Sequence, residues 1–200
     1  RSVTVYSRCI RTVYPSIPVV IGGIEASLRR IAHFDYWANK VYLSVLQDSG
    51  ADLLVFGNAE RQIVELTHRL ASGETITDIT DLRGTAFWRG KPPAEWYEID
   101  STQVDTPGRL NPPDDPYAME GVRGVAAPAT GPSQQDSTGI RVVFSAKQVP
   151  AKARETSVIR LPAFEAVRKD PVLYAHASRV LHVEANPGNA RALVQRHGDR

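Results

Sequence analysis

Residues 18–30 read P-V-V-I-G-G-I-E-A-S-L-R-R, and this stretch decides the fold. Val19, Val20 and Ile21 are β-branched residues, which favour strands. The run is apolar on both faces, which is typical of a strand buried in a parallel sheet. Two glycines then allow a tight turn, and Glu25 puts a negative charge where the dipole of a following helix favours it. We therefore predict a strand, a turn and a helix in succession.

Residues 52–61, D-L-L-V-F-G-N-A-E-R, repeat this pattern with a strand over residues 53–56, a turn at Gly57 and Asn58 as the helix N-cap. The carboxyl ends of parallel strands share one sheet edge, where helix N–H groups can hold a phosphate or a cofactor tail. Two turns without any ligand explain the spacing equally well, because neither matches G-x-G-x-x-G. The candidate pocket residues are Gly22, Gly23, Glu25, Gly57, Asn58 and Glu60.

Composition describes an ordinary globular chain of 200 residues, 42% hydrophobic and 23% charged. The net charge of +2, without a dense Lys/Arg run, gives no indication of a nucleic-acid partner. No apolar stretch approaches membrane-spanning length, and no secretory signal is present. Cys9 is the one cysteine, so a disulfide framework or a multi-cysteine metal or iron–sulfur site within this chain is excluded. This cysteine usage fits the cytoplasm.

The first element expected is a helix over residues 2–14. Its packing stripe comprises Val3, Tyr6, Ile10 and Val13, with Cys9 buried and unreactive. The chain starts inside this helical pattern without an initiator methionine and ends on charged residues. We therefore expect a segment of a longer protein, with the first strands of the sheet lying upstream and the sheet open at one edge.

The stretch I-A-H-F-D-Y-W crowds His33, Asp35, Tyr36 and Trp37 together. These side chains could line a cleft around a flat ligand, or plug the sheet edge as ordinary aromatic packing, which is the simpler interpretation. The roles of His33 and Asp35 stay open. Spacing predicts that residues 35–47 are helical.

Beyond the second turn we predict a helix that ends at Gly73 and buries Ile63, Leu66 and Leu70. Alternation predicts a strand over residues 76–82, paired as a hairpin with residues 84–88. Proline and glycine then become dense, which indicates a flexible insertion or linker over residues 105–140. It separates an α/β part, residues 1–104, from a C-terminal part, residues 141–200.

In the C-terminal part we predict strands over residues 140–144 and 157–161 and a short helix over residues 164–169. A second helix should start at Pro171 with Asp170 as its N-cap, and a last helix should follow Asn186. His176 and His182 are six residues apart, so they do not form an i, i+4 metal pair. The role of His176 stays open.

Four blocks carry a resemblance to a known family: I-P-V-V-I-G-G-I-E-A-S-L-R-R-I-A-H-F-D-Y-W, A-D-L-L-V-F-G-N-A-E-R-Q-I-V-E-L-T-H-R-L-A, D-L-R-G-T-A-F, and D-P-V-L-Y-A-H-A-S-R-V-L-H-V-E-A-N-P-G-N-A-R-A-L-V-Q-R-H-G-D. They closely resemble YgiQ-type radical SAM proteins. The resemblance implies an α/β fold: a partial Rossmann-like, cobalamin-binding-type parallel sheet preceding the radical SAM barrel, then the flexible insertion and a C-terminal strand–helix–helix connection. In that domain type a Gly-Gly turn and a Gly-x-x-Glu turn end the later strands, and they match Gly22–Gly23 and Gly57 to Glu60.

The resemblance also implies cofactors that this chain cannot hold. A radical SAM barrel uses a C-x-x-x-C-x-x-C loop to bind a [4Fe–4S] cluster and S-adenosylmethionine, and this chain has only Cys9. The D-x-H-x-x-G loop that supplies a cobalamin ligand is absent from these 200 residues and could precede Arg1, so cobalamin is possible as a cofactor but unsupported. The implied parent is a cytoplasmic radical SAM enzyme with an unknown substrate, and the expected partner of this chain is its own barrel.

Two functional hypotheses follow. In the first, the glycine turns of an accessory domain line a nucleotide-like or substrate pocket. In the second, the chain is a non-catalytic Rossmann-like scaffold, which a pocket filled by Phe34, Tyr36 and Trp37 would favour. A nicotinamide-dependent enzyme is disfavoured because the dinucleotide fingerprint is missing.

Overall fold

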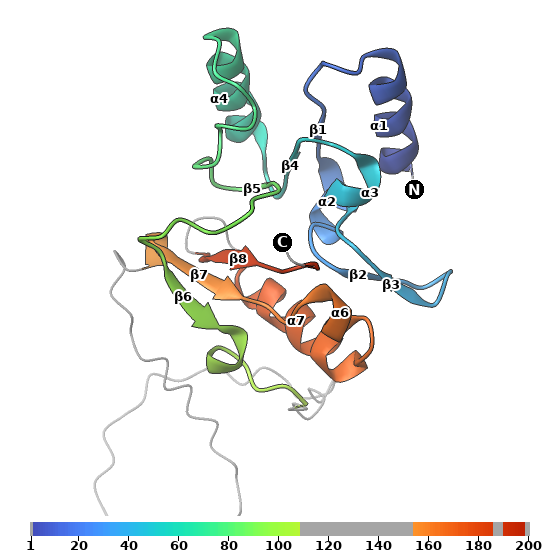
Figure 1. The fold of residues 1–200 in the computed structure, drawn as a ribbon, viewed down its shortest axis with the longest axis vertical. Helices are drawn as coiled ribbons and strands as arrows, with labels where there is room; N and C mark the ends of the chain where they lie inside the picture. Colours follow the sequence, from blue (N-terminus) through green and yellow to red (C-terminus); the bar gives the residue numbers. More distant parts are fainter. Residues whose placement is uncertain (1, 109–153, 186–189, 199–200) are drawn as a thin grey trace, which may run out of the picture. The chain divides into compact units, whose positions relative to one another are not determined.

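The computed structural model describes residues 2–108, 154–185 and 190–198, all within a compact unit formed by residues 1–108 and 150–200 (Figure 1). The predicted strand at residues 140–144, the cap at Asn186 and nearly all of the predicted insertion lie outside the described residues.

Helices and strands are interspersed along the described chain, which confirms the predicted α/β class. The elements are α1 (Ser2–Val13), β1 (Val20–Ile21), α2 (Gly23–Leu28), β2 (His33–Asp35), β3 (Lys40–Tyr42), α3 (Val45–Ser49), β4 (Leu53–Val55), α4 (Glu60–Ala71), β5 (Thr85–Ala86), β6 (Tyr97–Asp100), the 3-10 helix η1 (Ser101–Gln103), β7 (Ser157–Arg160), α6 (Phe164–Val167), α7 (Pro171–Val183) and β8 (Ala192–Val194). Among the described residues, no helix has the length and apolar character needed to cross a membrane.

The first sheet has the strand order β1-β4-β5. Strands β1 and β4 are parallel, with Val20 opposite Leu53, as the two repeated sequence units predict. Alternate residues of β4 enter different cores: Leu54 packs in the cluster that includes Val45 of α3, whereas Leu53 packs in the cluster that includes Leu66 of α4. Burial on both faces explains why this strand is a continuous apolar run.

A hairpin of β2 and β3 replaces most of the helix that we predicted over residues 35–47, and only residues 45–47 are helical, at the start of α3. Phe34 lies opposite Val41, and the Asp35 carboxylate accepts the backbone N–H of Ala38 at 3.0 Å, which stabilises the turn. Asn39 completes the turn in the left-handed region with φ 50°. The four-residue recurrence of apolar residues was therefore misleading, because turn chemistry and cross-strand pairing decide this segment.

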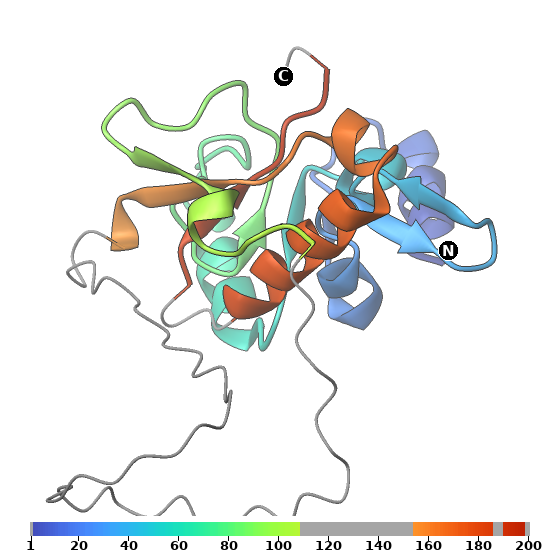
Figure 2. The same cartoon turned by 90° about the horizontal axis from the view of Figure 1, so that it is seen from below.

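The second sheet has the order β6-β7-β8, and all three strands are parallel. Helices α6 and α7 connect β7 to β8, and Val180 of α7 packs in one core cluster with Ile99 and Ile159 (Figure 2). The Asp170 cap is confirmed, since its Oδ1 accepts the Val172 N–H at 2.8 Å. The last predicted helix is wrong: these residues form β8, because pairing with β7 overrides local helix propensity.

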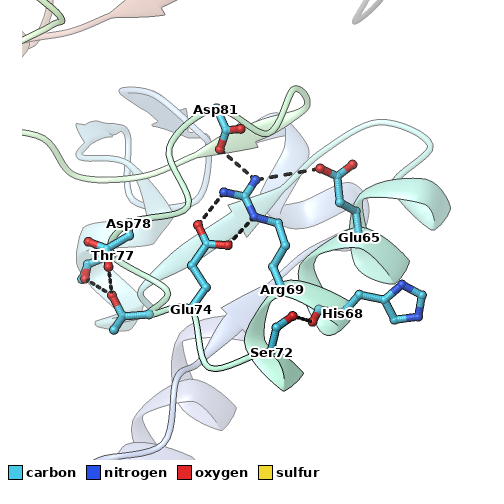
Figure 3. A network of polar contacts seen from close by, with 9 residues as sticks. Glu65, His68, Arg69, Ser72, Glu74, Thr77, Asp78 and Asp81 are labelled. Atoms are coloured by element: carbon cyan, nitrogen blue, oxygen red, sulfur yellow. Dashed lines mark hydrogen bonds and ion pairs between the residues drawn. The ribbon is translucent and has the colours of Figure 1, made fainter.

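The segment after α4 forms turns instead of the predicted strand over residues 76–82, although Ile79 within it is fully buried. The Arg69 guanidinium binds Glu74 at 2.6 Å and Asp81 at 2.8 Å, which holds the segment on α4 (Figure 3). The hydrogen bonds that Arg69 donates to Glu74, and then to Asp81, raise the pKa of Arg69. Strand β5 pairs antiparallel with β4, so the predicted hairpin partner of residues 84–88 is also wrong.

Helix α1 contradicts two predictions about its packing. Of the predicted stripe, only Val3 packs against the core cluster that includes Ile21. Tyr6 and Val13 are 69% and 65% exposed, and Cys9 is exposed, not buried. Ser7 is the buried residue of the helix, and Arg11 forms an ion pair with Asp52 at 2.6 Å. The side of α1 that contacts the rest of the unit is thus mostly polar, with Val3 as an apolar contact.

Candidate functional site

The Gly22–Gly23 turn lies directly against strand β4. A Cβ atom on Gly22 would be 2.9 Å from Val55 Cγ2 and 3.4 Å from the Val55 carbonyl oxygen. Gly22 is extended, with φ −161°, so close packing and not backbone conformation requires a glycine there. Because β1 and β4 are parallel, this turn and the Gly57 turn both follow the carboxyl ends of their strands, at one edge of the sheet.

Gly23 and Gly57 have the opposite character. Both have positive φ, 84° and 74°, and no atom of the described residues lies within 4 Å of the Cβ position of either. They are needed for the shape of the turns, while the space beside them is open. Asn58 is exposed and does not cap α4, contrary to the prediction. The N-cap residue is Ala59, which makes no side-chain capping bond.

The two candidate carboxylates are placed differently. Glu25 accepts hydrogen bonds from Ser2 Oγ and from the Arg29 guanidinium, each at 3.1 Å. Glu60 is exposed at the start of α4 and lines an open hollow on that helix. The remaining lining residues of this hollow are Arg61, Val64, Glu65, His68 and Arg69. The hollow therefore does not include the candidate glycines.

Arg30 is a candidate that the sequence interpretation missed. Its guanidinium lies over the Phe56 ring, 4.5 Å from the ring centroid, and donates to the Ser27 carbonyl at 2.5 Å. Burial lowers the pKa of Arg30. Phe56 immediately precedes Gly57, so a half-buried cation lies on the side chain next to the second turn. Only the tertiary fold brings Arg30 to Phe56, and no local motif indicates this contact.

The aromatic stretch neither fills a pocket nor plugs the first sheet. Tyr36 and Trp37 lie at the hairpin turn, 79% and 92% exposed, in an edge-to-face pair. His33 is buried and stacks on Tyr42, and its Nδ1 has no hydrogen-bond partner in the part of the chain that the structure describes. Burial is the main cause that lowers the pKa of His33. Filling of a pocket by these aromatic rings, which would have favoured a scaffold, is not observed.

A buried Ser–His–Asp arrangement joins η1 to α7. The His176 ring places Nδ1 2.8 Å from Asp105 Oδ2 and Nε2 2.9 Å from Ser101 Oγ, and Arg179 donates to the same carboxylate at 2.8 Å. Burial raises the pKa of Asp105, but the hydrogen bonds from His176 and Arg179 outweigh it and leave the pKa lowered. Ser101 is only 2% exposed and His176 is fully buried, so a substrate cannot reach the hydroxyl. This network is structural. Sequence analysis did not predict it because His176 is more than 70 residues from both Ser101 and Asp105.

The described residues contain no group of three or more His, Cys, Asp or Glu side chains that could hold a metal ion. Cys9 is exposed on α1, and it is the only cysteine of the sequence. Three thiolates around one cluster cannot come from this chain.

The chain was compared with known proteins. A family model described as Radical SAM N-terminal matches residues 1–200. A UPF0313 protein of Pseudomonas putida is 55% identical over 200 residues, which are 100% of this chain and 26% of that protein. A UPF0313 protein of Chromobacterium violaceum is 53% identical over 208 residues, covering 100% of this chain and 27% of that protein. The UPF0313 protein YgiQ of Salmonella typhimurium is 49% identical over 201 residues, with the same coverage of 100% and 27%.

The chain spans about a quarter of the length of these curated relatives. No solved structure matches it.

Proposed function

Because the chain belongs to the radical SAM N-terminal family, we propose that it is the N-terminal accessory domain of a radical SAM enzyme. The relatives confirm the resemblance to YgiQ-type proteins that the sequence blocks indicated. The family match over all 200 residues is the observation that carries the proposal.

The cofactors of the intact enzyme would be a [4Fe–4S] cluster and S-adenosylmethionine, which together supply one-electron chemistry. The residues of this chain do not fit the cluster, since they include one cysteine. We therefore assign both cofactors to the remainder of the parent protein, which is also the expected partner of this domain. Cobalamin has no support, because the D-x-H-x-x-G loop is absent.

The contribution of this chain would be a small-molecule pocket at the carboxyl edge of a Rossmann-like β1–β4 pair. The support is local: the open space beside Gly23 and Gly57, and the Arg30 cation on Phe56 next to the second turn. The competing scaffold function is favoured by Gly22, whose packing on Val55 needs no ligand, and by Glu25, which is already hydrogen-bonded. We place the intact protein in the cytoplasm, in keeping with the single cysteine of this chain, and expect neither nucleic acid nor membrane as a partner.

Iron and sulfide analysis of the intact parent, purified without oxygen, tests the enzyme proposal. About four iron and four sulfide atoms per chain are expected, as a [4Fe–4S] cluster requires. An intact protein that holds neither after reconstitution would overturn the proposal.

Amide hydrogen exchange in the intact parent separates pocket from scaffold. S-adenosylmethionine and adenosine triphosphate serve as nucleotide-like probes. The pocket predicts slower exchange around Gly22 and Gly57 with one of them, and loss of that effect in Gly57→Ala, where φ is 74°. Gly90→Ala is the matched control, because Gly90 has open space at its Cβ position and no positive φ. Unchanged exchange with both probes would favour the scaffold.

A further inference from the structure

Arg30 is a half-buried cation that forms no ion pair with a carboxylate of the described residues. Every other half-buried arginine in the described ranges has such a partner. The pairs are Arg11 with Asp52, Arg29 with Glu25, Arg69 with Glu74, Arg160 with Asp100, Arg179 with Asp105, and Arg191 with Glu184. Arg30 therefore departs from the pattern that the half-buried arginines of this unit otherwise follow.

The guanidinium of Arg30 is nevertheless held in place by two contacts. Its central carbon, Cζ, lies 4.5 Å from the centroid of the Phe56 ring, and Nη1 donates to the Ser27 carbonyl at 2.5 Å. Burial of a charge without a counter-ion is unfavourable, because the charge loses hydration and gains no ion pair in return. Desolvation accordingly lowers the pKa of Arg30. A positioned cation that lacks an anion has the character of an anion-binding residue.

These contacts leave one edge of the guanidinium available. Phe56 covers one face of it, and Ser27 takes a hydrogen bond from Nη1. Within the described ranges, Nε and Nη2 of Arg30 have no acceptor. These two nitrogens carry parallel N–H bonds, and such a fork matches two oxygens of one carboxylate or phosphate group. A single anionic group can thus supply both the missing acceptors and the missing charge.

The ring that carries Arg30 adjoins the second glycine turn. Phe56 is followed directly by Gly57, which is exposed and has open space at its Cβ position. Strands β1 and β4 are parallel, and the turn follows the carboxyl end of β4, the edge at which α/β sheets bind ligands. Without a Cβ atom, Gly57 allows close approach of a molecule whose anionic group lies on Arg30.

We propose that Arg30 binds the anionic group, a phosphate or a carboxylate, of a small molecule at the Gly57 turn. The inference rests on the pocket proposed above and adds the chemical class of its ligand. Phe56 and Ser27 fix the orientation of the guanidinium, and the anion of the ligand completes the ion pair that the fold leaves unmade.

Modification of arginine by phenylglyoxal tests the site in the intact parent, with the peptide containing Arg30 quantified by mass spectrometry. Inorganic phosphate and acetate are the probes, and sodium chloride at equal ionic strength controls for screening. A probe at about ten times its dissociation constant should slow modification of Arg30 about elevenfold. Arg168, which is exposed at the end of α6, should be unaffected. Protection by one probe alone assigns the group, and equal rates in phosphate, acetate and chloride would overturn the proposal.

Two variants separate binding from packing. Arg30→Met keeps an unbranched side chain on Phe56 and removes the unpaired charge. Without added anion, its β4 amides should therefore exchange as slowly as in the unsubstituted parent, or more slowly. Exchange about tenfold faster would show that Arg30 is structural and would overturn the proposal. Arg30→Lys keeps a cation without the fork, so about tenfold more probe should be needed to slow exchange around Gly57.

Hydrogen exchange around Gly57 also distinguishes this inference from the proposed pocket. Adenosine triphosphate and S-adenosylmethionine both carry an anionic group. If either slows exchange equally in the parent and in Arg30→Met, the pocket stands and the role of Arg30 is wrong. If neither slows exchange while phosphate or acetate protects Arg30, the anion site stands and the nucleotide-like pocket is wrong.

Discussion

Replacing Asp105 by alanine should loosen the attachment of α7 more than any exposed carboxylate substitution. Asp105 Oδ2 is 2.8 Å from His176 Nδ1 and also accepts from the Arg179 guanidinium at 2.8 Å. Its removal leaves a ring nitrogen without a partner in a fully buried side chain. The Arg179 side chain is 34% exposed, so water can solvate its charge after the loss.

The two consequences have different sizes. An unsatisfied buried N–H costs about 1–3 kcal/mol. The loss of a partly exposed ion pair adds about 0.5–1 kcal/mol. We therefore expect the opening free energy of α7 to fall by about 1.5–4 kcal/mol, which is a roughly 10- to 1,000-fold increase in exchange rate. Asp105→Asn keeps a carbonyl acceptor for His176 and should lower the opening free energy of α7 by less than Asp105→Ala.

Native-state hydrogen exchange of α7 amides in the intact parent measures this effect. Glu155→Ala is the control, because Glu155 is an exposed carboxylate shortly before β7. If α7 exchange in Asp105→Ala stays within about threefold of the parent protein, the network does not contribute as the contacts indicate.

Four further outcomes are expected. Gly22→Ala should lower the opening free energy of β4, measured by hydrogen exchange, by about 1–3 kcal/mol, because the new Cβ would meet Val55 Cγ2 at 2.9 Å. Adding Val55→Ala should recover part of this loss. Additive losses in the double variant would contradict this account. Burial lowers the pKa of His33, which means that the folded state favours the neutral ring. The contribution of His33 to stability is therefore complete above the ordinary histidine pKa of about 6.5, and it is lost as the pH falls below that value. Hairpin exchange should therefore accelerate on acidification, and this pH dependence should be absent from His33→Gln. Tyr174→Phe removes the hydroxyl that accepts a β2 backbone N–H at 3.0 Å and should destabilise hairpin docking by about 0.5–1.5 kcal/mol, as hairpin exchange would show. The isolated chain, with the β1 edge free, should associate or unfold at ordinary temperature, and a sharp cooperative melt of a monomer would refute this.

Local signals predicted those elements that are determined locally. The β-branched run before Gly22 gave a buried strand, and Asp170 before Pro171 marked the start of α7 correctly. Elements that depend on distant partners were missed. Residues 192–194 are a strand only because β7 lies beside them, and β6 was not predicted at all.

The candidate site shows the same division. Sequence spacing placed both glycine turns at the carboxyl ends of parallel strands, which is where the structure has them. It could not find Arg30 on Phe56, or Ser101 and Asp105 around His176, because these contacts join residues far apart in the chain. The exposed face of α1 was mistaken for a core stripe, since periodicity shows that a face is apolar but not what covers it.

The second sheet imposes an order of events during synthesis. Tyr97 of β6 pairs with Ser157 of β7, and the cross-strand partners Asp100 and Arg160 are 60 residues apart. At about 5–20 residues per second, the ribosome needs about 3–12 s to make that stretch. The β1-β4-β5 sheet ends at Ala86, so its strands have emerged before β6 can find its neighbour. A nascent chain paused in this interval would expose β6 as an unpaired strand, and the amides of Tyr97 to Asp100 should exchange freely until β7 emerges.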